Sequence, residues 1–317
     1  MTANRIDQSA RGVYVIAATP FTAEGAVDHD STRRLVDFYL SRGAHGLTAL
    51  GMMGEQQKLS PEESFAFVET FLKRVDARVP VIVGAATPWL DNLKAFAARM
   101  MDLGAAAIMI APMQGLRSDE QIYNFFGQVC SALDGIPVVL QDYPQTTGVY
   151  MAPSLISRMI DEFDNIVMFK HEDYPGLAKL SAVRSHGEAK GRRVPILVGN
   201  GAIHYPQELA RGADGAMTGF SFPEMTVDVY ELWRQGKSEE AETLYDAYLP
   251  MVRHELQPGL GLAIRKYVLA RRGAIATDHV RLPGPKLSAE DKSEIDRLIR
   301  RLERRLAELG RPVKVSA

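Results

Sequence analysis

The stretch Ile166-Val167-Met168-Phe169-Lys170-His171-Glu172 indicates the fold, because four apolar residues run without alternation into a lysine. A short run of this kind is typical of a strand that is buried on both faces in a parallel sheet. Seven more such runs recur along the chain, namely Val13–Ala18, Gly46–Leu50, Val79–Val83, Ala105–Ile110, Ile136–Leu140, Pro195–Val198 and Gly215–Met217. The sequence therefore predicts eight buried strands.

Stretches with helical spacing separate these runs. Ser60–Val75 opens with Ser-Pro-Glu-Glu, which places a capping serine before a first-turn proline and early acidic residues. The other predicted helices between strands are Asp30–Arg42, Asp91–Leu103, Ser118–Leu133, Pro153–Asp161, Gly176–Arg184 and His204–Arg211. Eight strands alternating with helices predict an α/β fold of the (β/α)8 TIM-barrel type. A doubly wound open sheet is the alternative, but no Gly-x-Gly-x-x-Gly motif follows the first strand.

After Phe222 the pattern becomes purely helical, with helices predicted at Glu224–Gln235, Ser238–Glu255, Leu260–Arg272 and Ser288–Leu309. We therefore expect a barrel that carries the active site over residues 10–222 and a helical C-terminal extension over residues 223–317. Apolar residues are interleaved with the arginines of the stretch 297–305. That pattern favours an amphipathic helix over a segment that binds nucleic acid.

Composition narrows the class of protein. The 317 residues are 46% apolar and carry a formal net charge of -2, which argues against a protein that binds nucleic acid or a membrane surface. We find no apolar run of about 18 residues and no signal-peptide pattern. Cys130 is the single cysteine, which excludes an intrachain disulfide, and its helical context favours core packing over a nucleophile. A cytoplasmic enzyme is expected, with no nucleic-acid or membrane partner.

Lys170 is the first candidate for chemistry. Reactive residues of a (β/α)8 barrel lie at the carboxyl ends of the strands, and Lys170 ends an apolar strand, where desolvation disfavours the charged ammonium. A neutral amine there attacks a carbonyl and forms a Schiff base, which withdraws electrons from the neighbouring carbon. The alternative is a lysine that pairs with a carboxylate or extends to solvent.

The histidines argue against metal chemistry. The seven histidines include no His-x-His and no His-Glu-x-x-His pattern, so a metal centre is not expected. No cofactor is expected either. Strand alternation directs His171 to the face opposite Lys170, and His45 lies at the other end of the barrel. The Gly199-Asn200-Gly201 turn is a candidate for anion binding through backbone amides, or simply a tight connection.

Several motifs occur together in this chain, namely Thr19-Pro20-Phe21, Gly51-x-x-Gly54-Glu55, Pro144-x-x-Thr147-Gly148 and Lys170. Through them the chain resembles the dihydrodipicolinate synthase/N-acetylneuraminate lyase family over about residues 10–310. The resemblance implies that Lys170 forms a Schiff base with a pyruvate-like 2-oxo acid and that the Gly51–Glu55 loop holds the acid's carboxylate through backbone amides. It also implies an apolar contact to the lysine from Met217 and a homotetrameric assembly.

The chain departs from the family pattern at several positions. Met52 and Met53 stand where hydroxyl residues are usual, and a thioether has no donor for a carboxylate. Gln141 occupies the position of the family's catalytic tyrosine. Tyr143, two residues further along the chain, is the candidate to take over the role of that tyrosine. Thr146 replaces an arginine of synthases that use an aldehyde bearing a carboxylate. A dihydrodipicolinate synthase with these residues would lack its proton relay and second carboxylate clamp.

The segments Gln141-Asp142-x-Pro144 and Lys170-x-Glu172-x-x-Pro175-Gly176 resemble those of 2-keto-3-deoxy sugar-acid dehydratases, notably the 2-keto-3-deoxyarabonate type. This resemblance implies a Schiff base, loss of a proton from the next carbon and loss of the β-hydroxyl as water. Glu172 shares the strand-face direction of Lys170 and is the candidate acid or base, with a rim salt bridge as the alternative. Gln141 and Asp142 are candidates for orienting substrate hydroxyls, and Asp142 alternatively caps the following turn.

The expected function is a class I lyase that dehydrates a 2-keto-3-deoxy sugar acid, a small-molecule 2-oxo acid, through Lys170. The alternatives are a dihydrodipicolinate synthase or pyruvate-dependent aldolase, and a non-catalytic 2-oxo-acid-binding regulator. The missing tyrosine favours the regulator, and the retained Lys170 opposes it. The expected catalytic residues are Lys170, Glu172 and Gln141, and the expected substrate contacts are Gly51, Met52, Met53, Asp142, Tyr143, Gly199 and Met217.

Overall fold

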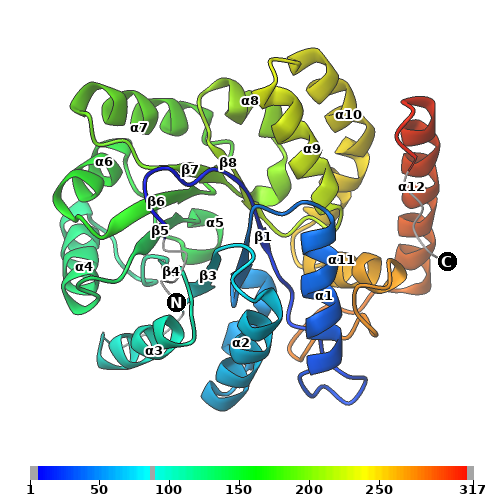
Figure 1. The fold of residues 1–317 in the computed structure, drawn as a ribbon, viewed down its shortest axis with the longest axis horizontal. Helices are drawn as coiled ribbons and strands as arrows, with labels where there is room; N and C mark the ends of the chain where they lie inside the picture. Colours follow the sequence, from blue (N-terminus) through cyan, green and yellow to red (C-terminus); the bar gives the residue numbers. More distant parts are fainter. Residues whose placement is uncertain (1–5, 86–89, 313–317) are drawn as a thin grey trace.

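The structure, a computed structural model, describes residues 6–85 and 90–312. Its strands form one closed parallel barrel in the order β1 to β8, which confirms the predicted (β/α)8 fold and rules out the open sheet (Figure 1). The strands are β1 (Gly12–Ile16), β2 (Gly46–Ala49), β3 (Val81–Gly84), β4 (Ala107–Ile110), β5 (Val138–Asp142), β6 (Ile166–His171), β7 (Ile196–Val198) and β8 (Gly215–Thr218).

Helices surround the barrel on its outside (Figure 1). They are α1 (His29–Ser41), α2 (Pro61–Val75), α3 (Leu90–Asp102), α4 (Asp119–Ala132), α6 (Pro153–Glu162), α7 (Leu177–Lys190), α8 (Tyr205–Ala210) and α9 (Pro223–Arg234). Short elements follow three of the strands, namely η1 (Met52–Gly54) and η2 (Gln56–Lys58), α5 (Pro144–Thr147), and η3 (Asn200–Ala202). Each helix predicted between strands is present, and most boundaries agree to within a residue or two.

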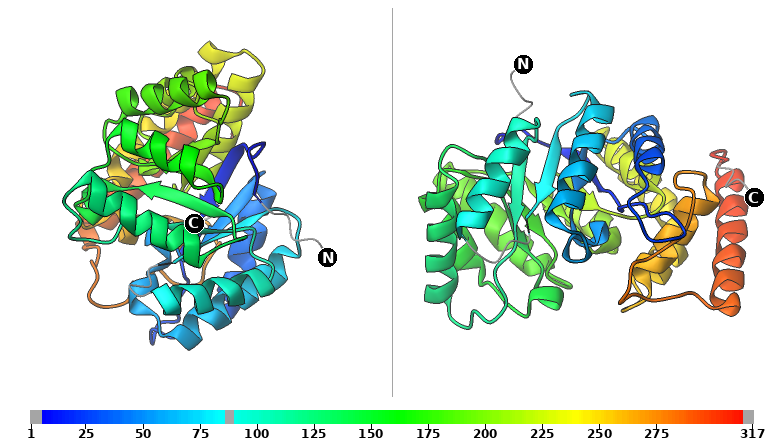
Figure 2. Two further views of the ribbon diagram at one scale, coloured as in Figure 1. Left: turned by 90° about the vertical axis from the view of Figure 1, so that its left-hand side faces the viewer. Right: turned by 90° about the horizontal axis from the view of Figure 1, so that it is seen from below.

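The C-terminal extension contains α10 (Ser238–Glu255), α11 (Gly261–Arg271) and α12 (Ala289–Glu308). Figure 2 shows α12 at one edge of the molecule, and α12 packs against α10. α9 contacts β1 and α8, so it takes the place of the eighth barrel helix. The division into residues 10–222 and 223–317 stays a prediction, and the last five residues lie outside the described ranges.

The first turn of α2 shows how local sequence sets a helix boundary. Ser60 Oγ accepts a hydrogen bond from the Glu63 amide at 3.1 Å, and Glu63 Oε2 accepts one from the Ser60 amide at 2.9 Å. This reciprocal capping box satisfies two amides that the helix itself leaves unpaired. The predicted serine cap is therefore confirmed.

Strands β5 and β6 continue two residues beyond the predicted apolar runs. Gln141 pairs with Lys170, and Asp142 pairs with His171. Paired residues of parallel neighbours project to the same face, so Gln141 and Lys170 share the inner face of the barrel. The polar residues end the apolar pattern, but the backbone pairing does not stop there.

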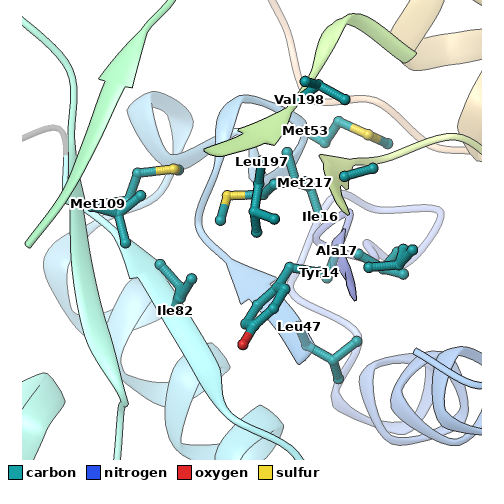
Figure 3. Close-up of a cluster of buried hydrophobic side chains, with 14 of the residues drawn as sticks. Tyr14, Ile16, Ala17, Leu47, Met53, Ile82, Met109, Leu197, Val198 and Met217 are labelled. Atoms are coloured by element: carbon teal, nitrogen blue, oxygen red, sulfur yellow. The ribbon is translucent and has the colours of Figure 1, made fainter. Parts of the chain in front are cut away.

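Apolar side chains from several strands fill the barrel interior. Figure 3 shows Tyr14, Ile82, Leu197 and Met217 gathered inside it. Tyr14 projects toward Gly46 of the next strand, where a Cβ would collide with the phenol ring. Glycine at position 46 therefore gives the tyrosine its space in the packed interior.

The amphipathic character predicted for residues 297–305 is confirmed in α12. Its apolar side chains Ile295, Ile299, Leu302 and Leu306 are buried, whereas the side chains of Arg297 and Arg305 are more than half exposed. Of the helices in residues 6–85 and 90–312, none is both long enough and apolar enough to cross a lipid bilayer.

Glu208 of α8 is a buried carboxyl away from the barrel interior. Its Oε2 atom has no hydrogen-bond partner in the described part of the chain. Burial raises the pKa of Glu208 from 4.5 to about 8, because the charged form loses its hydration.

Replacing Glu208 by glutamine is expected to remove a pH dependence of stability. Between pH 4.5 and 8 the carboxyl is ionised in the unfolded chain but protonated in the fold, so the original protein loses stability as the pH rises. From pH 5 to pH 8 we expect it to lose about 3 kcal/mol more than Glu208→Gln. Urea unfolding at both pH values measures the free energy of unfolding of each protein. Equal losses in the original protein and in Glu208→Gln would contradict a raised pKa at this carboxyl.

Candidate active site

Lys170 lies on β6 with its side chain fully buried. Its Nζ atom is 2.8 Å from Glu172 Oε1, which is ion-pair distance, although the two atoms are not aligned as a hydrogen bond. Glu172 is itself buried, with 6% of its surface exposed. A buried ammonium and carboxylate lose their hydration together, so each depends on the other for charge compensation.

Gln141 completes a three-residue cluster around the Glu172 carboxylate. Its Nε2 atom donates to Glu172 Oε1 at 2.6 Å, so one oxygen faces both the amide and the lysine. The cluster follows from strand register, because Gln141 and Lys170 are paired across β5 and β6. The structure thus brings the three expected catalytic side chains together, and their roles stay predictions.

The loop after β7 fixes Glu172 from the other side. A Cβ on Gly199 would collide with the Cγ and Oε2 atoms of Glu172, so only glycine leaves room for this carboxylate. Asn200 Nδ2 donates to the backbone oxygen of Glu172 at 2.6 Å. The sequence predicted this turn as an anion site or a tight connection, but not its contacts with Glu172, because they join residues that only the fold brings together.

The expected carboxylate loop forms the 3-10 helix η1 directly after β2. Gly51 precedes this helix, and Thr19 Oγ1 donates to the Gly54 carbonyl at 2.7 Å. Met52 and Met53 begin η1, and the first amides of a helix have no intrahelical acceptor. Met53 is buried (Figure 3). It packs beside Gly219, whereas Met52 is 42% exposed.

Asp142 faces away from this cluster. Its Oδ2 atom is 2.9 Å from Lys179 Nζ on α7, and its strand partner is His171 rather than Lys170. The cause is the two-residue alternation of a strand, which turns Asp142 outward when Gln141 points inward. The expected contact between Asp142 and substrate hydroxyls does not fit this outward placement.

Tyr143 and Met217 complete the expected set. Tyr143 is half-buried just before α5, and burial together with the negative charge of Glu172 raises the pKa of its phenol. The phenol therefore lies within electrostatic reach of the Glu172 carboxylate. Met217 is fully buried on β8 and projects into the barrel interior (Figure 3).

Other reactive groups lie elsewhere. In the part of the chain that the structure describes, no group of three or more His, Cys, Asp or Glu side chains is arranged to hold a metal ion. Burial raises the pKa of the Cys130 thiol to about 12, which keeps it protonated and unreactive at neutral pH. His171 Nε2 lies 3.0 Å from the Gly176 carbonyl, away from Lys170.

Comparison with known proteins places this site in a family. The model of the dihydrodipicolinate synthetase family matches residues 9–302. An L-2-keto-3-deoxyarabonate dehydratase from Azospirillum brasilense is 33% identical over 307 residues, which cover 92% of this chain and 94% of that protein. A 4-hydroxy-tetrahydrodipicolinate synthase from Pelodictyon phaeoclathratiforme is 29% identical over 288 residues, which cover 90% of this chain and 95% of that protein.

A solved structure agrees with these matches. The crystal structure of a dihydrodipicolinate synthase from Rhodopseudomonas palustris is 43% identical in sequence, with a TM-score of 0.91. The similarity covers 94% of this chain and 99% of that chain, so it includes both the barrel and the helices that follow it. From the match over residues 9–302 and these relatives, the chain belongs to the dihydrodipicolinate synthetase family of lyases.

Proposed function

We propose that this lyase dehydrates a 2-keto-3-deoxy sugar acid through a Schiff base on Lys170. The observation that carries the proposal is the position of Glu172 Oε1, 2.8 Å from Lys170 Nζ and 2.6 Å from Gln141 Nε2. One carboxyl is thereby placed next to the atom that forms the Schiff base, at a site where Gln141 replaces the family's tyrosine. The similarity to an L-2-keto-3-deoxyarabonate dehydratase supports the same reaction class.

The first half of the reaction makes the electron sink. Glu172 accepts a proton from the Lys170 ammonium, and the neutral amine attacks the C2 carbonyl of the 2-oxo acid. The protonated carboxyl then returns its proton to the departing hydroxyl, and water leaves as the iminium forms. The iminium acidifies the C3 hydrogens, and the Glu172 carboxylate, now free, removes one of them.

The second half expels water from the substrate. The enamine electrons form a C3–C4 double bond as the C4 hydroxyl leaves with the proton held by Glu172. In a five-carbon acid with a terminal alcohol, loss of a proton from C5 and protonation at C3 give an enol, which becomes the terminal aldehyde. Hydrolysis of the iminium consumes one water and frees Lys170, so the net reaction removes one water from the substrate.

A synthase or aldolase is the second candidate, because a solved structure 43% identical to this chain is described as a dihydrodipicolinate synthase. Condensation with an aldehyde that bears a carboxylate needs a second anion clamp. Thr146 offers a neutral hydroxyl where that clamp would be an arginine, and Gln141 offers an amide where the proton relay would be a phenol. These two side chains favour dehydration over condensation.

The homotetramer remains a prediction for this chain.

Trapping with pyruvate and sodium borohydride tests the Schiff base. Reduction of the imine is expected to leave one covalent adduct, which intact-mass measurement and peptide mapping place on Lys170. Lys170→Met removes the amine and is the control that must stay unlabelled. An adduct at another lysine, or none, would refute the proposal, and an adduct without turnover on any 2-keto-3-deoxy acid would favour the regulator.

Glu172→Gln tests the proposed acid and base. The amide keeps the shape of the carboxyl but cannot carry the proton, so we expect kcat for dehydration to fall by about 100-fold or more. Turnover is measured by coupling the aldehyde product to a dehydrogenase, with release of pyruvate monitored in parallel to detect aldol cleavage. The control Glu208→Gln makes the same change at a buried carboxyl outside the site. Unchanged turnover in Glu172→Gln would remove Glu172 from the mechanism.

Gly199→Ala tests whether the loop after β7 sets the position of Glu172. The added methyl would occupy the space of the carboxylate, so we expect kcat to fall about 10-fold or more without a comparable loss of stability. Gly127→Ala is the matched control, because a Cβ at this position of α4 lies 3.4 Å from Phe163, which follows α6, and that is an ordinary contact. Equal turnover in the two variants would show that Glu172 tolerates displacement.

A further inference from the structure

The proposed carboxylate loop ends at Glu55, whose backbone is left-handed with a φ of 49°. The side chains of Met52 and Met53 supply no hydrogen-bond donors, so binding of a carboxylate at this loop depends on backbone amides. Backbone amides bind an anion well only when the backbone is held in place. A misplacement of a binding group by about 1 Å is enough to reduce its contribution to binding strongly. The groups that hold Glu55 in place therefore affect how well the loop binds an anion.

Glu55 is a buried carboxylate with three donors around it. Lys266 Nζ is 2.5 Å from its Oε1 atom, and Lys58 Nζ is 2.8 Å from its Oε2 atom. The backbone amide of Arg281 donates to the same Oε2 at 3.1 Å. Two of these donors belong to the C-terminal extension, more than 200 residues away in sequence.

Lys266 is the central member of this network. Its side chain is fully buried on α11, where Nζ also donates to the His279 carbonyl at 2.8 Å and lies 4.3 Å from the ring centre of Phe21. Burial lowers the pKa of Lys266 to about 8, so the ammonium stays mostly protonated at neutral pH. A buried cation with this geometry needs its carboxylate partner, which ties Glu55 to α11.

The network is also positively charged overall. The cations Lys266, Lys58 and Arg281 face the carboxylates of Glu55 and Glu63, so one positive charge remains. A net positive charge behind the loop favours an anion in front of it. The network thus favours anion binding at the loop in two ways, because it fixes the backbone and adds a positive charge behind it.

We propose that Lys266 is a positioning residue, which holds Glu55 from the C-terminal extension so that the Gly51–Gly54 backbone can bind the carboxylate of the 2-oxo acid. The inference rests on the proposed function for the identity of that ligand. Its structural part, the hold of Lys266 on the loop, stands separately and is tested separately.

Lys266→Met tests the inference, because methionine fills similar space without charge or donors. We expect KM for the 2-oxo acid, and the pyruvate concentration needed for half-maximal trapping, to rise about 10-fold or more. We expect kcat to change less than about 3-fold, since Lys170 and Glu172 are untouched. Hydrogen exchange of the peptide that contains residues 51–55 should accelerate in the same variant.

Arg272→Met is the matched control. Arg272 follows α11 directly, pairs with Glu224 of α9 at 2.5 Å and donates to the Ser221 carbonyl at 2.7 Å. Its loss therefore disturbs the extension and the loop after β8 without touching Glu55. In Arg272→Met we expect the KM and the hydrogen exchange over residues 51–55 to equal those of the unmodified protein. Lys266→Arg keeps the charge on a longer side chain and should raise KM by an intermediate factor, which provides a test if Lys266→Met does not fold.

The outcomes separate the two proposals. If the unmodified protein forms no adduct, the proposed function fails, and hydrogen exchange alone then decides the role of Lys266. If exchange over residues 51–55 is the same in Lys266→Met and the unmodified protein, the positioning role is wrong. It is equally wrong if KM rises by the same factor in Arg272→Met.

Discussion

The burial of the Lys170 ammonium inside an apolar barrel is the constraint on which the candidate site depends. A cation without hydration is costly, and Glu172 Oε1 at 2.8 Å is the charge that compensates it. The same arrangement that resolves the cost of burial also places a proton acceptor beside the amine. In the proposed mechanism, the carboxylate that compensates the buried ammonium is therefore also the one that accepts its proton.

The surroundings of Glu172 follow from that requirement. Gln141 donates to its carboxylate from β5, Asn200 donates to its backbone from the loop after β7, and Gly199 leaves the space that the side chain occupies. A register shift between Val138 and Val139 precedes the segment in which Gln141 pairs with Lys170. Residues on or after three neighbouring strands thus contribute to the placement of one side chain.

Local patterns in the sequence were enough to predict the strands, the helices and the cap at Ser60, because each depends on residues close together in the chain. Strand alternation also predicted correctly that Glu172 would lie near Lys170. Asp142 lies outward, because strand alternation and not residue type sets the direction of a side chain at the end of a strand. The contacts of Gly199 and Lys266 could not be predicted, since each depends on a partner that only the folded barrel brings near.

The C-terminal helices are part of the framework of the site rather than an appendage. Neighbouring residues of α11 serve two loops at the catalytic end, because Lys266 meets Glu55 after β2 while Arg265 Nε lies 3.1 Å from Glu255 Oε2. Glu255 in turn accepts hydrogen bonds from Ser221 after β8. A barrel that ended at residue 222 would leave Glu55 buried without its main cation and Ser221 without its carboxylate. The proposed binding loop and the extension must therefore fold together for the loop to reach a conformation that binds an anion.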